Sequence, residues 1–394
     1  MTPARSGERA QFAASLHDML ADADVPAATR CWADGDRAPG LAVWRALAGL
    51  GVTALAVPER DGGLGASLAD VVVACAELGH HAVPGPVAES VAAVPVLLAT
   101  LPRDAAAGDV AAGDLAAGDL AAEDLAAWAA AAGDWAVPWL AGLAAGELIA
   151  TAALPPWLPW AVDTGAAGLV LLAEGDMVRL ATPGARHRSV DPGRSLSPVT
   201  GGQVLARGPG VAGAVARALD AGALACAAQL LGAGRALLEA SVRHAGQRAQ
   251  FGRPVGAFQA VKHQLADVAI GLEFAGPLLD AAAAALDAGS GDAARDVSAA
   301  KVACTDAARR AARAALQVHG AIGYTEELDL HLWLLKVRAL AGAWGSQAGH
   351  RARVMAAISV PDGDPETARE PALVQPAAGP PATEDPAAGV PVWS

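Results

Sequence analysis

Two short stretches concentrate the residue types that could hold an anionic ligand. The first, QRAQFGRPVGAFQAVKH at residues 247–263, offers Arg248, Gln250, Phe251 and Gln259. A guanidinium binds phosphate through paired hydrogen bonds, and a helix that restarts after Pro254 presents unpaired amide groups to an anion. Spacing alone leaves an ordinary turn between helices, carrying a surface arginine, about equally favoured.

The second stretch is QVHGAIGYTEE at residues 317–327, which also falls at a predicted helix break. It supplies Gln317 and two glycines, Gly320 and Gly323, followed by Tyr324. A second polar, glycine-containing break between long helices shifts the balance toward a ligand-binding role for both stretches.

The elements that must position these residues are mostly helical. The 394-residue chain is rich in alanine, leucine, valine and glycine and has few aromatic residues, which favours helices packed through small side chains. We therefore predict a mainly α protein with a small β domain. The predicted organisation is an N-terminal helical domain at 1–147 with a low-complexity insertion at 105–126, a reduced β domain at 148–208, a C-terminal four-helix bundle at 209–358 and a Pro/Ala-rich tail at 359–394.

Within this scheme, the segment LVLLAEGDMVRLAT at 169–182 predicts a β-hairpin. Four long helical patterns follow at 211–247, 256–288, 293–319 and 326–357, and short breaks between long helices indicate an antiparallel bundle.

Charge and cysteine usage exclude several classes of function. The net charge of −13 argues against a nucleic-acid partner. The four cysteines lie far apart, with no CxxC pair and no histidine at metal-ligand spacing, so no metal site is expected and the thiols are expected to be reduced. Without a leader pattern or a long uninterrupted apolar run, we expect a cytoplasmic protein that does not enter a membrane.

Taken together, the two stretches resemble the acyl-CoA dehydrogenase family. Its C-terminal bundle carries the signatures R-x-x-F-G-x-x-x-x-x-x-Q and Q-x-x-G-G-x-G-Y, which match the stretches beginning at Arg248 and at Gln317. The segment VPERDGGLGASLADVVVACAELG is similar to the family's N-terminal helical domain, and DPGRSLSPV is similar to the end of its middle β domain. The resemblance implies that family's fold for most of the chain.

The resemblance also implies FAD, which in the family lies extended between subunits with its ADP half held by a neighbour. It places Arg248 and Phe251 at the pyrophosphate and adenine end with Gln259 beside them, and Gln317 with Gly320 at a second contact. Gln250 is also expected to bind the cofactor. The second glycine of the G-G pair is Ala321 in this chain, so one close backbone contact is altered.

The catalytic base of the family has no counterpart at the matching positions. Its commonest site, before a glycine, is occupied by Trp344, and the alternative site on the preceding long helix matches Gly222. An indole is not a base, and the nearest acid, Asp220, is two residues and about 200° around the helix from Gly222. Asp220 is therefore expected to be a solvated carboxylate rather than a base, and no catalytic residue is assigned. The β region 148–208 also lacks the family's T-E-P-x-A-G-S-D-like segment.

These features are typical of a non-catalytic subunit of a heteromeric acyl-CoA dehydrogenase. The family branch most resembled is the bacterial α2β2 enzymes that act on steroid side-chain CoA thioesters, in which a homologous partner would supply the base and most of the FAD site. An electron-transfer flavoprotein is the expected electron acceptor. Two alternatives stay open: a complete homo-oligomeric dehydrogenase with an unusual base, and a redox-inactive structural homologue.

Overall fold

The computed structural model describes residues 3–102, 135–325 and 327–359. Helices, then strands, then long helices follow one another along the chain, which confirms the predicted mainly α fold with a small β region. The described residues all belong to one compact unit, Met1–Val360. The predicted insertion at 105–126 and the tail from 360 onward lie outside the described residues. The predicted domain boundaries inside this unit stay a prediction.

The N-terminal part is built from helices that bury one apolar face. On α1, Leu16 and Leu20 lie one turn apart and are both buried, and this face packs against α4. Ser67 and Asp70 form a capping box at the start of α4. The elements are α1 (Pro3–Asp22), α2 (Val25–Asp34), α3 (Ala38–Gly49), the 3₁₀ turns η1 (Val52–Ala54) and η2 (Glu59–Asp61), α4 (Leu68–His80), the π-helical turn η3 (Glu89–Ala93), α5 (Val94–Thr100) and α7 (Ala136–Ala145).

Seven short strands follow and form two small sheets. The first has the order β1-β3-β4-β7, with β1 parallel to β3 and the other neighbours antiparallel, and the second has the order β2-β6-β5. The predicted hairpin is confirmed, because β3 and β4 pair across the two residues Gly175 and Asp176. The strands are β1 (Ala150–Ala153), β2 (Ala161–Val162), β3 (Leu169–Glu174), β4 (Met177–Pro183), β5 (His187–Arg188), β6 (Ser195–Ser197) and β7 (Val199–Arg207).

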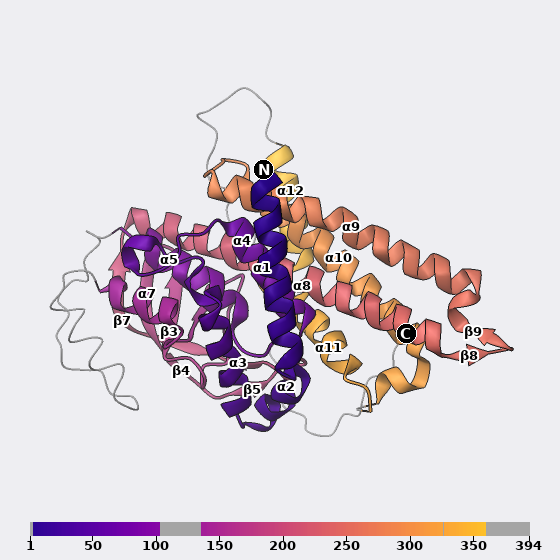
Figure 1. Ribbon diagram of the computed structural model, residues 1–394. Helices are drawn as coiled ribbons and strands as arrows, with labels where there is room; N and C mark the ends of the chain where they lie inside the picture. The colour runs from indigo at the N-terminus through magenta and orange to yellow at the C-terminus, as the bar shows by residue number, and fades with distance from the viewer. Residues whose placement is uncertain (1–2, 103–134, 326, 360–394) are drawn as a thin grey trace, which may run out of the picture. The chain divides into compact units, whose positions relative to one another are not determined.

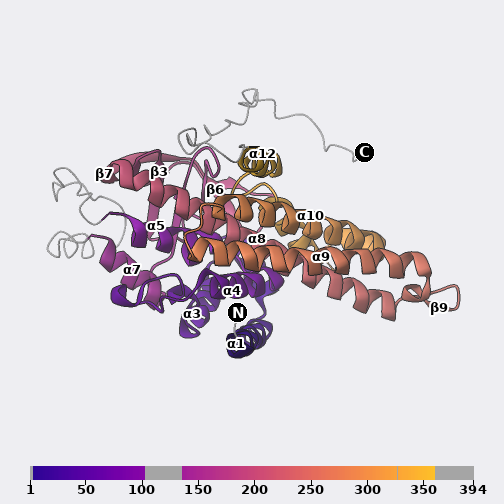
Figure 2. The same cartoon turned by 90° about the horizontal axis from the view of Figure 1, so that it is seen from above.

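A bundle around the 39-residue helix α8 completes the described chain. Figures 1 and 2 show α8, α9 and α10 running along one another, with the β8–β9 hairpin at the end where α8 passes into α9. The elements are α8 (Pro209–Gln247), β8 (Ala249–Gln250), β9 (Arg253–Pro254), η4 (Val255–Ala257), α9 (Gln259–Asp287), α10 (Ala293–His319), η5 (Gly320–Tyr324), α11 (Leu330–Leu340) and α12 (Gln347–Ile358).

Glycines let α8 approach the N-terminal part closely. A Cβ added at Gly232 on α8 would lie 1.8 Å from the carbonyl oxygen of Ala76, and one added at Gly79 on α4 would lie 2.1 Å from that of Gln229. The two helices therefore cross with their backbones in contact, and this crossing fixes the end of α4 against the middle of α8.

The fourth long helix predicted at 326–357 is instead two helices, α11 and α12, separated by residues 341–346. The break contains Trp344 with a φ of 57°, a left-handed conformation that no α-helix contains. A chain reversal at this point is what brings Trp344 into the core, as described below.

Two of these helices, α8 and α9, have the length and hydropathy of a membrane span. The apolar window of α8 is 67% buried inside the protein. On α9 the exposed apolar residues Ile270, Phe274 and Leu278 recur every four positions, and Asp267 and Glu273 are exposed among them. Val268, Leu272 and Leu279 form the buried face of α9, so the exposed stripe is a second apolar set on this helix.

Candidate functional site

The two sequence signatures meet at one surface pocket of about 260 Å³, which we call the junction pocket. It opens where the connection from α8 to α9 lies beside the end of α10. Its lining residues are Arg248, Gln250, Val255, Val261, Gln264, Gln317, Val318, His319 and Gly320. The structure therefore brings together Arg248 and Gln250 from the first signature with Gln317 and Gly320 from the second.

The hairpin beside the pocket is built around a strained aromatic residue. Strands β8 and β9 pair through a two-residue turn, in which Phe251 and Gly252 both have positive φ, 52° and 77°. Such a turn suits the twist of a hairpin, but a bulky side chain adopts this conformation at a cost. The side chain of Phe251 is 91% exposed, so it projects from the hairpin with little contact to its own chain.

The far wall of the pocket is polar and incompletely satisfied. Gln264 Nε2 donates a 2.8 Å hydrogen bond to Gln317 Oε1, which fixes the amide of Gln317 across the pocket. His319 contacts the Ala315 carbonyl at 2.8 Å and stacks on His244, with ring centroids 4.3 Å apart. The Nε2 atom of His244 is buried without a hydrogen-bond partner, and burial lowers the pKa of this ring, as do the charges of His319 and Arg248. A polar atom left unpaired beside a pocket is a group that a ligand or water could satisfy.

Three of the predicted cofactor residues do not line the junction pocket. Gln259 is exposed at the first position of α9, Phe251 projects from the hairpin, and Ala321 is exposed in η5. The backbone at Ala321 does not have a positive φ, so the methyl group that replaces a glycine hydrogen adds no backbone strain. From the surface, Phe251 and Gln259 could still contact a ligand shared with a second chain.

The two positions at which the family's base could be carried lie against each other in the core. A Cβ added at Gly222 on α8 would lie 2.2–2.5 Å from three ring carbons of Trp344. Trp344 is 1% exposed and fills the space that a side chain from either position would enter. We call Gly222, Trp344 and the residue described next, Glu89, the filled centre.

Glu89 is a buried carboxyl group that the sequence reasoning missed. It begins the π-helical turn η3, and its Oε1 accepts a 3.2 Å hydrogen bond from Trp344 Nε1. Burial raises the pKa of Glu89, and the guanidinium of Arg194 partly offsets this. An acidic residue within an apolar run, AESVAAVPVLL, was the only signal in the sequence.

The space beside Glu89 is far too small for a substrate. A cavity of about 10 Å³ lies there, lined by Gly85, Val87, Ala88, Glu89, Arg194, Gln229, Lys336, Leu340 and Trp344. That volume holds about one water molecule. Lys336 forms a buried ion pair with Asp191 at 3.2 Å and donates a 3.0 Å hydrogen bond to the Val83 carbonyl. The polar groups around the cavity are thus held by one another in a closed core.

Trp344 is fixed from its other side as well. Its carbonyl oxygen lies 2.8 Å from Nε2 of His350, whose Nδ1 lies 3.1 Å from the Ser298 hydroxyl. Gly345 donates a 3.1 Å hydrogen bond to the Trp157 carbonyl, and the Trp157 and His350 rings lie 5.1 Å apart. These contacts hold the left-handed turn at Trp344 in place.

Asp220 does not face the filled centre, and the expectation that it is solvated is wrong. It is 5% exposed, and its two oxygens accept hydrogen bonds from the guanidinium of Arg353 at 2.5 and 3.3 Å. Burial raises its pKa, while Arg353 lowers it. Because Arg353 comes from α12, more than a hundred positions away in the sequence, local periodicity could not reveal this ion pair. A carboxylate held in such a pair is poorly placed to accept a proton from a substrate.

Comparison with known proteins adds the family context. The acyl-CoA dehydrogenase C-terminal domain matches residues 209–359, and the corresponding N-terminal domain matches residues 6–101. Acyl-CoA dehydrogenase IpdE2 of Mycobacterium tuberculosis is 30% identical over 346 residues, which span 86% of this chain and 93% of the relative. Acyl-CoA dehydrogenase FadE34 of the same organism is 32% identical over 318 residues, which span 80% of this chain and 42% of FadE34.

Solved structures share the fold. The Tcur3481–Tcur3483 steroid ACAD G363A variant superposes with a TM-score of 0.70 at 21% identity, covering 90% of this chain and 98% of that chain. Butyryl-CoA dehydrogenase from Megasphaera elsdenii superposes with a TM-score of 0.67 at 19% identity, covering 91% and 98%. At these identities the likeness is one of fold.

Proposed function

The chain belongs to the acyl-CoA dehydrogenase family, and from that membership we propose that it is the non-catalytic subunit of a heteromeric, FAD-dependent acyl-CoA dehydrogenase. In this proposal a homologous partner supplies the catalytic glutamate and binds the acyl-CoA. This chain contributes Arg248 and Gln317 to the partner's FAD and completes the helical core of an α2β2 assembly.

The single observation that carries the proposal is the filled centre. Proton abstraction next to a thioester needs a base within hydrogen-bond reach of the substrate. At the two positions where the family carries that base, this chain has Trp344 and Gly222, and the indole occupies the space between them. A chain with this core has no room for an acyl group beside its own α8.

The junction pocket, in contrast, suits the ADP half of FAD. It offers one guanidinium, three amide side chains and a glycine backbone at Gly320, whose φ is 65°. Arg248 would bind the pyrophosphate, and Gln317 and Gly320 would contact the adjoining part of the nucleotide. When bound, FAD would supply the acceptor for the hydride that leaves the β-carbon of an acyl-CoA. The residues of this chain bind and orient the cofactor and take no part in proton transfer.

A partner subunit is supported by the exposed apolar surface. Ile270, Phe274 and Leu278 form a stripe along α9, and Phe251 projects from the adjacent hairpin. Contiguous exposed apolar side chains on a long helix are typical of a surface that another subunit covers. The stripe and the junction pocket both belong to the α8–α9 half of the bundle, so one neighbour could cover the stripe and provide the rest of the flavin site.

The substrate class, electron acceptor and compartment are proposed by analogy. The Tcur3481–Tcur3483 structure is described as a steroid ACAD and is named after two proteins. We extend this to a steroid side-chain CoA thioester as substrate, to an electron-transfer flavoprotein as electron acceptor and to the cytoplasm as location.

Flavin stoichiometry tests the proposal. The chain is expressed alone and together with a homologous acyl-CoA dehydrogenase subunit, and bound FAD per chain is measured by absorbance. We expect little flavin on the chain alone and about one FAD per heterodimer in the complex. A homo-oligomer of this chain that binds one FAD per chain and oxidises acyl-CoA would overturn the proposal.

Arg248→Ala in the co-expressed complex tests the assigned contact. Loss of a charge-assisted hydrogen bond costs about 1.5–3 kcal/mol, so the dissociation constant of FAD should rise by about 10- to 150-fold. Arg243→Ala is the matched control, because Arg243 lies on the last turns of α8 shortly before Arg248, is exposed and does not line the pocket. Equal flavin retention in the two variants would show that Arg248 does not hold the cofactor.

One observation favours a second candidate, a complete dehydrogenase that uses Glu89 as its base. A buried carboxyl group with a raised pKa is typical of catalytic acids and bases. Trp344 would then have to leave the centre before a substrate could bind. If Glu89→Gln abolished an activity of the chain expressed alone, this candidate would replace the first.

A further inference from the structure

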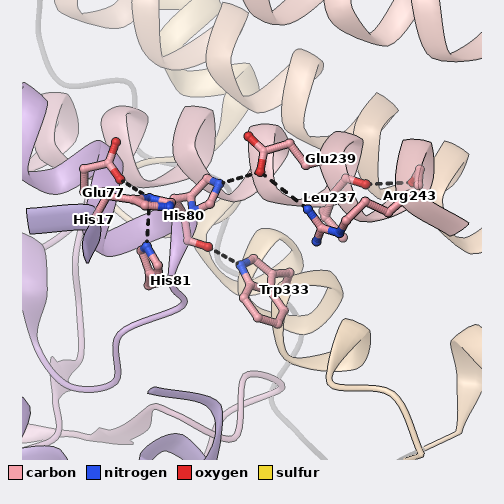
Figure 3. Close-up of polar contacts among 9 residues, drawn as sticks. His17, Glu77, His80, His81, Leu237, Glu239, Arg243 and Trp333 are labelled. Atoms are coloured by element: carbon pink, nitrogen blue, oxygen red, sulfur yellow. Dashed lines mark hydrogen bonds and ion pairs between the residues drawn. The ribbon is translucent and has the colours of Figure 1, made fainter. Parts of the chain in front are cut away.

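Three histidines and a glutamate converge at the surface between α1, α4 and α8, away from the junction pocket and the filled centre (Figure 3). His17 comes from α1, Glu77 and His80 from the last turn of α4, and His81 from the residue that follows it. One ligand atom from each lies within 4.8 Å of every other. Neither proposed function uses these residues.

Two short contacts in this histidine cluster cannot both be good hydrogen bonds, because they share the same ring nitrogen of His17. His17 Nδ1 lies 3.1 Å from Glu77 Oε2 and also 3.1 Å from His81 Nε2. A single ring nitrogen has either one proton or one lone pair, so it cannot form a good linear hydrogen bond with both partners. Both contact distances are close to the separation of two ligand atoms in a tetrahedral Zn²⁺ site, which is about 3.3 Å when the metal–ligand bonds are about 2.0–2.1 Å.

His80 is already held in the form that a metal ligand needs. Its Nε2 lies 3.1 Å from the Glu239 carboxylate on α8, and its Nδ1 is buried without a hydrogen-bond partner. A proton on Nε2 donated to Glu239 leaves a lone pair on Nδ1. A histidine that donates one ring nitrogen to a carboxylate and offers the other to the ion is the usual arrangement in zinc sites.

The surroundings keep the cluster in place and leave one side open. Trp333 Nε1 donates a 2.7 Å hydrogen bond to the His80 carbonyl, and the glycine crossing of α4 on α8 fixes the helix end. The His17 side chain is 44% exposed, which gives an ion access from solvent and lets this ring adjust.

We propose that His17, Glu77, His80 and His81 bind a divalent transition-metal ion, with Zn²⁺ as the ion best suited, and that Glu239 orients His80 from outside the ligand set. A set of imidazole nitrogens with one carboxylate oxygen favours Zn²⁺ over Mg²⁺ or Ca²⁺, which prefer ligand sets made of oxygen atoms. The ion would join α1 to the end of α4 and stabilise the N-terminal part of the subunit.

Zinc binding to the tag-free full-length chain tests this proposal. After dialysis against a chelator, the chain is titrated with Zn²⁺ in competition with a chromophoric chelator, and bound zinc is counted by elemental analysis. We expect one tightly bound Zn²⁺ per chain and a zinc-dependent rise in the thermal unfolding temperature. Co²⁺ in place of Zn²⁺ should show the visible absorption of a tetrahedral site.

Variants separate the cluster from histidines elsewhere. His17→Ala and His81→Ala should each weaken zinc binding at least tenfold and abolish the rise in unfolding temperature. Glu239→Ala, which removes only the partner of His80, should weaken binding by about 10- to 100-fold. His263→Ala is the matched control, because His263 is exposed on α9 outside the cluster, and it should change nothing.

Two results would overturn the proposal. One is the absence of stoichiometric zinc on the wild-type chain, and the other is equal zinc affinity in His17→Ala and His263→Ala. The apo forms of all variants are compared by circular dichroism, so a folding defect cannot be mistaken for a lost ligand.

Discussion

The filled centre and the β8–β9 hairpin beside the junction pocket each contain an aromatic residue in the left-handed conformation, and the two residues differ sharply in burial. Trp344 has a φ of 57° and is 1% exposed, with its indole packed on Gly222 and donating to Glu89. Phe251 has a φ of 52° and is 91% exposed at the tip of the β8–β9 hairpin. Backbone strain of this kind costs of order 1–3 kcal/mol and persists only where something offsets it.

For Trp344 the compensation lies within the chain. Burial of the indole and the hydrogen bonds around residues 344–345 offset the strain, so the conformation belongs to folding. For Phe251 the described residues offer little compensation: the Phe258 ring lies 6.2 Å away, edge to face. The filled centre is thus part of the folded core, whereas the described residues do little to offset the conformation at the hairpin. Four predictions test the contrast.

The largest effect is expected for Trp344→Ala. Removal of a buried indole leaves a cavity and an unpaired Glu89 carboxyl, so the free energy of unfolding should fall by about 3–5 kcal/mol. Urea denaturation measures it. Trp160→Ala, at a tryptophan that is 37% exposed, is the control and should cost less than about 1 kcal/mol. Similar losses in the two variants would mean that Trp344 is not a core residue.

His350 should give the filled centre a distinctive pH dependence. Burial lowers the pKa of this ring to about 4 from 6.5. The folded state disfavours the protonated His350 ring. The free energy of unfolding is therefore unaffected by this ring above about pH 6.5, and it falls as the pH drops toward 4, by about 3 kcal/mol at most.

His350→Gln should therefore flatten the stability profile between these two pH values. His244→Gln, at the half-buried histidine beside the junction pocket, should change the profile less, although the pKa of that ring is lowered too. Denaturation at several pH values measures both, and an unchanged slope in His350→Gln would contradict the assigned cause.

Gly222→Ala tests whether the two candidate base positions really share one space. The added methyl would meet the Trp344 ring at 2.2 Å, so we expect a loss of about 1–3 kcal/mol in the wild-type background. In a Trp344→Ala background the methyl enters vacated space and the loss should largely disappear. A double-mutant cycle with no coupling would show that the two residues do not compete.

The smallest effect on stability is expected for Phe251→Asn. Asparagine tolerates the left-handed conformation, so the free energy of unfolding should stay the same or rise by up to about 1 kcal/mol. The same variant should lose flavin from the heteromeric complex. A clear loss of stability in the isolated chain would instead assign Phe251 to the fold and end the contrast with Trp344.

Local patterns in the sequence were sufficient for much of the fold. The hairpin at 169–182 was predictable because Gly175 and Asp176 separate two apolar runs, and the helix at 293–319 has the predicted bounds. The helix predicted at 326–357 failed at residues 341–346, because the left-handed conformation of Trp344 depends on long-range packing that local periodicity does not report.

The candidate site also contains residues that the sequence predicted and residues that it did not. Arg248 and Gln317 were singled out by their motifs, and the junction pocket contains both. Asp220 was misjudged as solvated because its partner, Arg353, comes from another helix. Glu89 was not noticed because its burial depends on the crossing of α8 and on the return of the chain at residue 344.

The sequence by itself determined that Trp344 and Gly222 stand at the two positions where the family resemblance places a glutamate, and neither residue can act as a base. Only the tertiary structure decided that these two residues touch, that the space between them is closed, and that His17 meets His80 and His81. Motifs record side-chain chemistry at fixed spacing along the chain, whereas closed space and converging ligands depend on helix crossings between residues far apart in sequence.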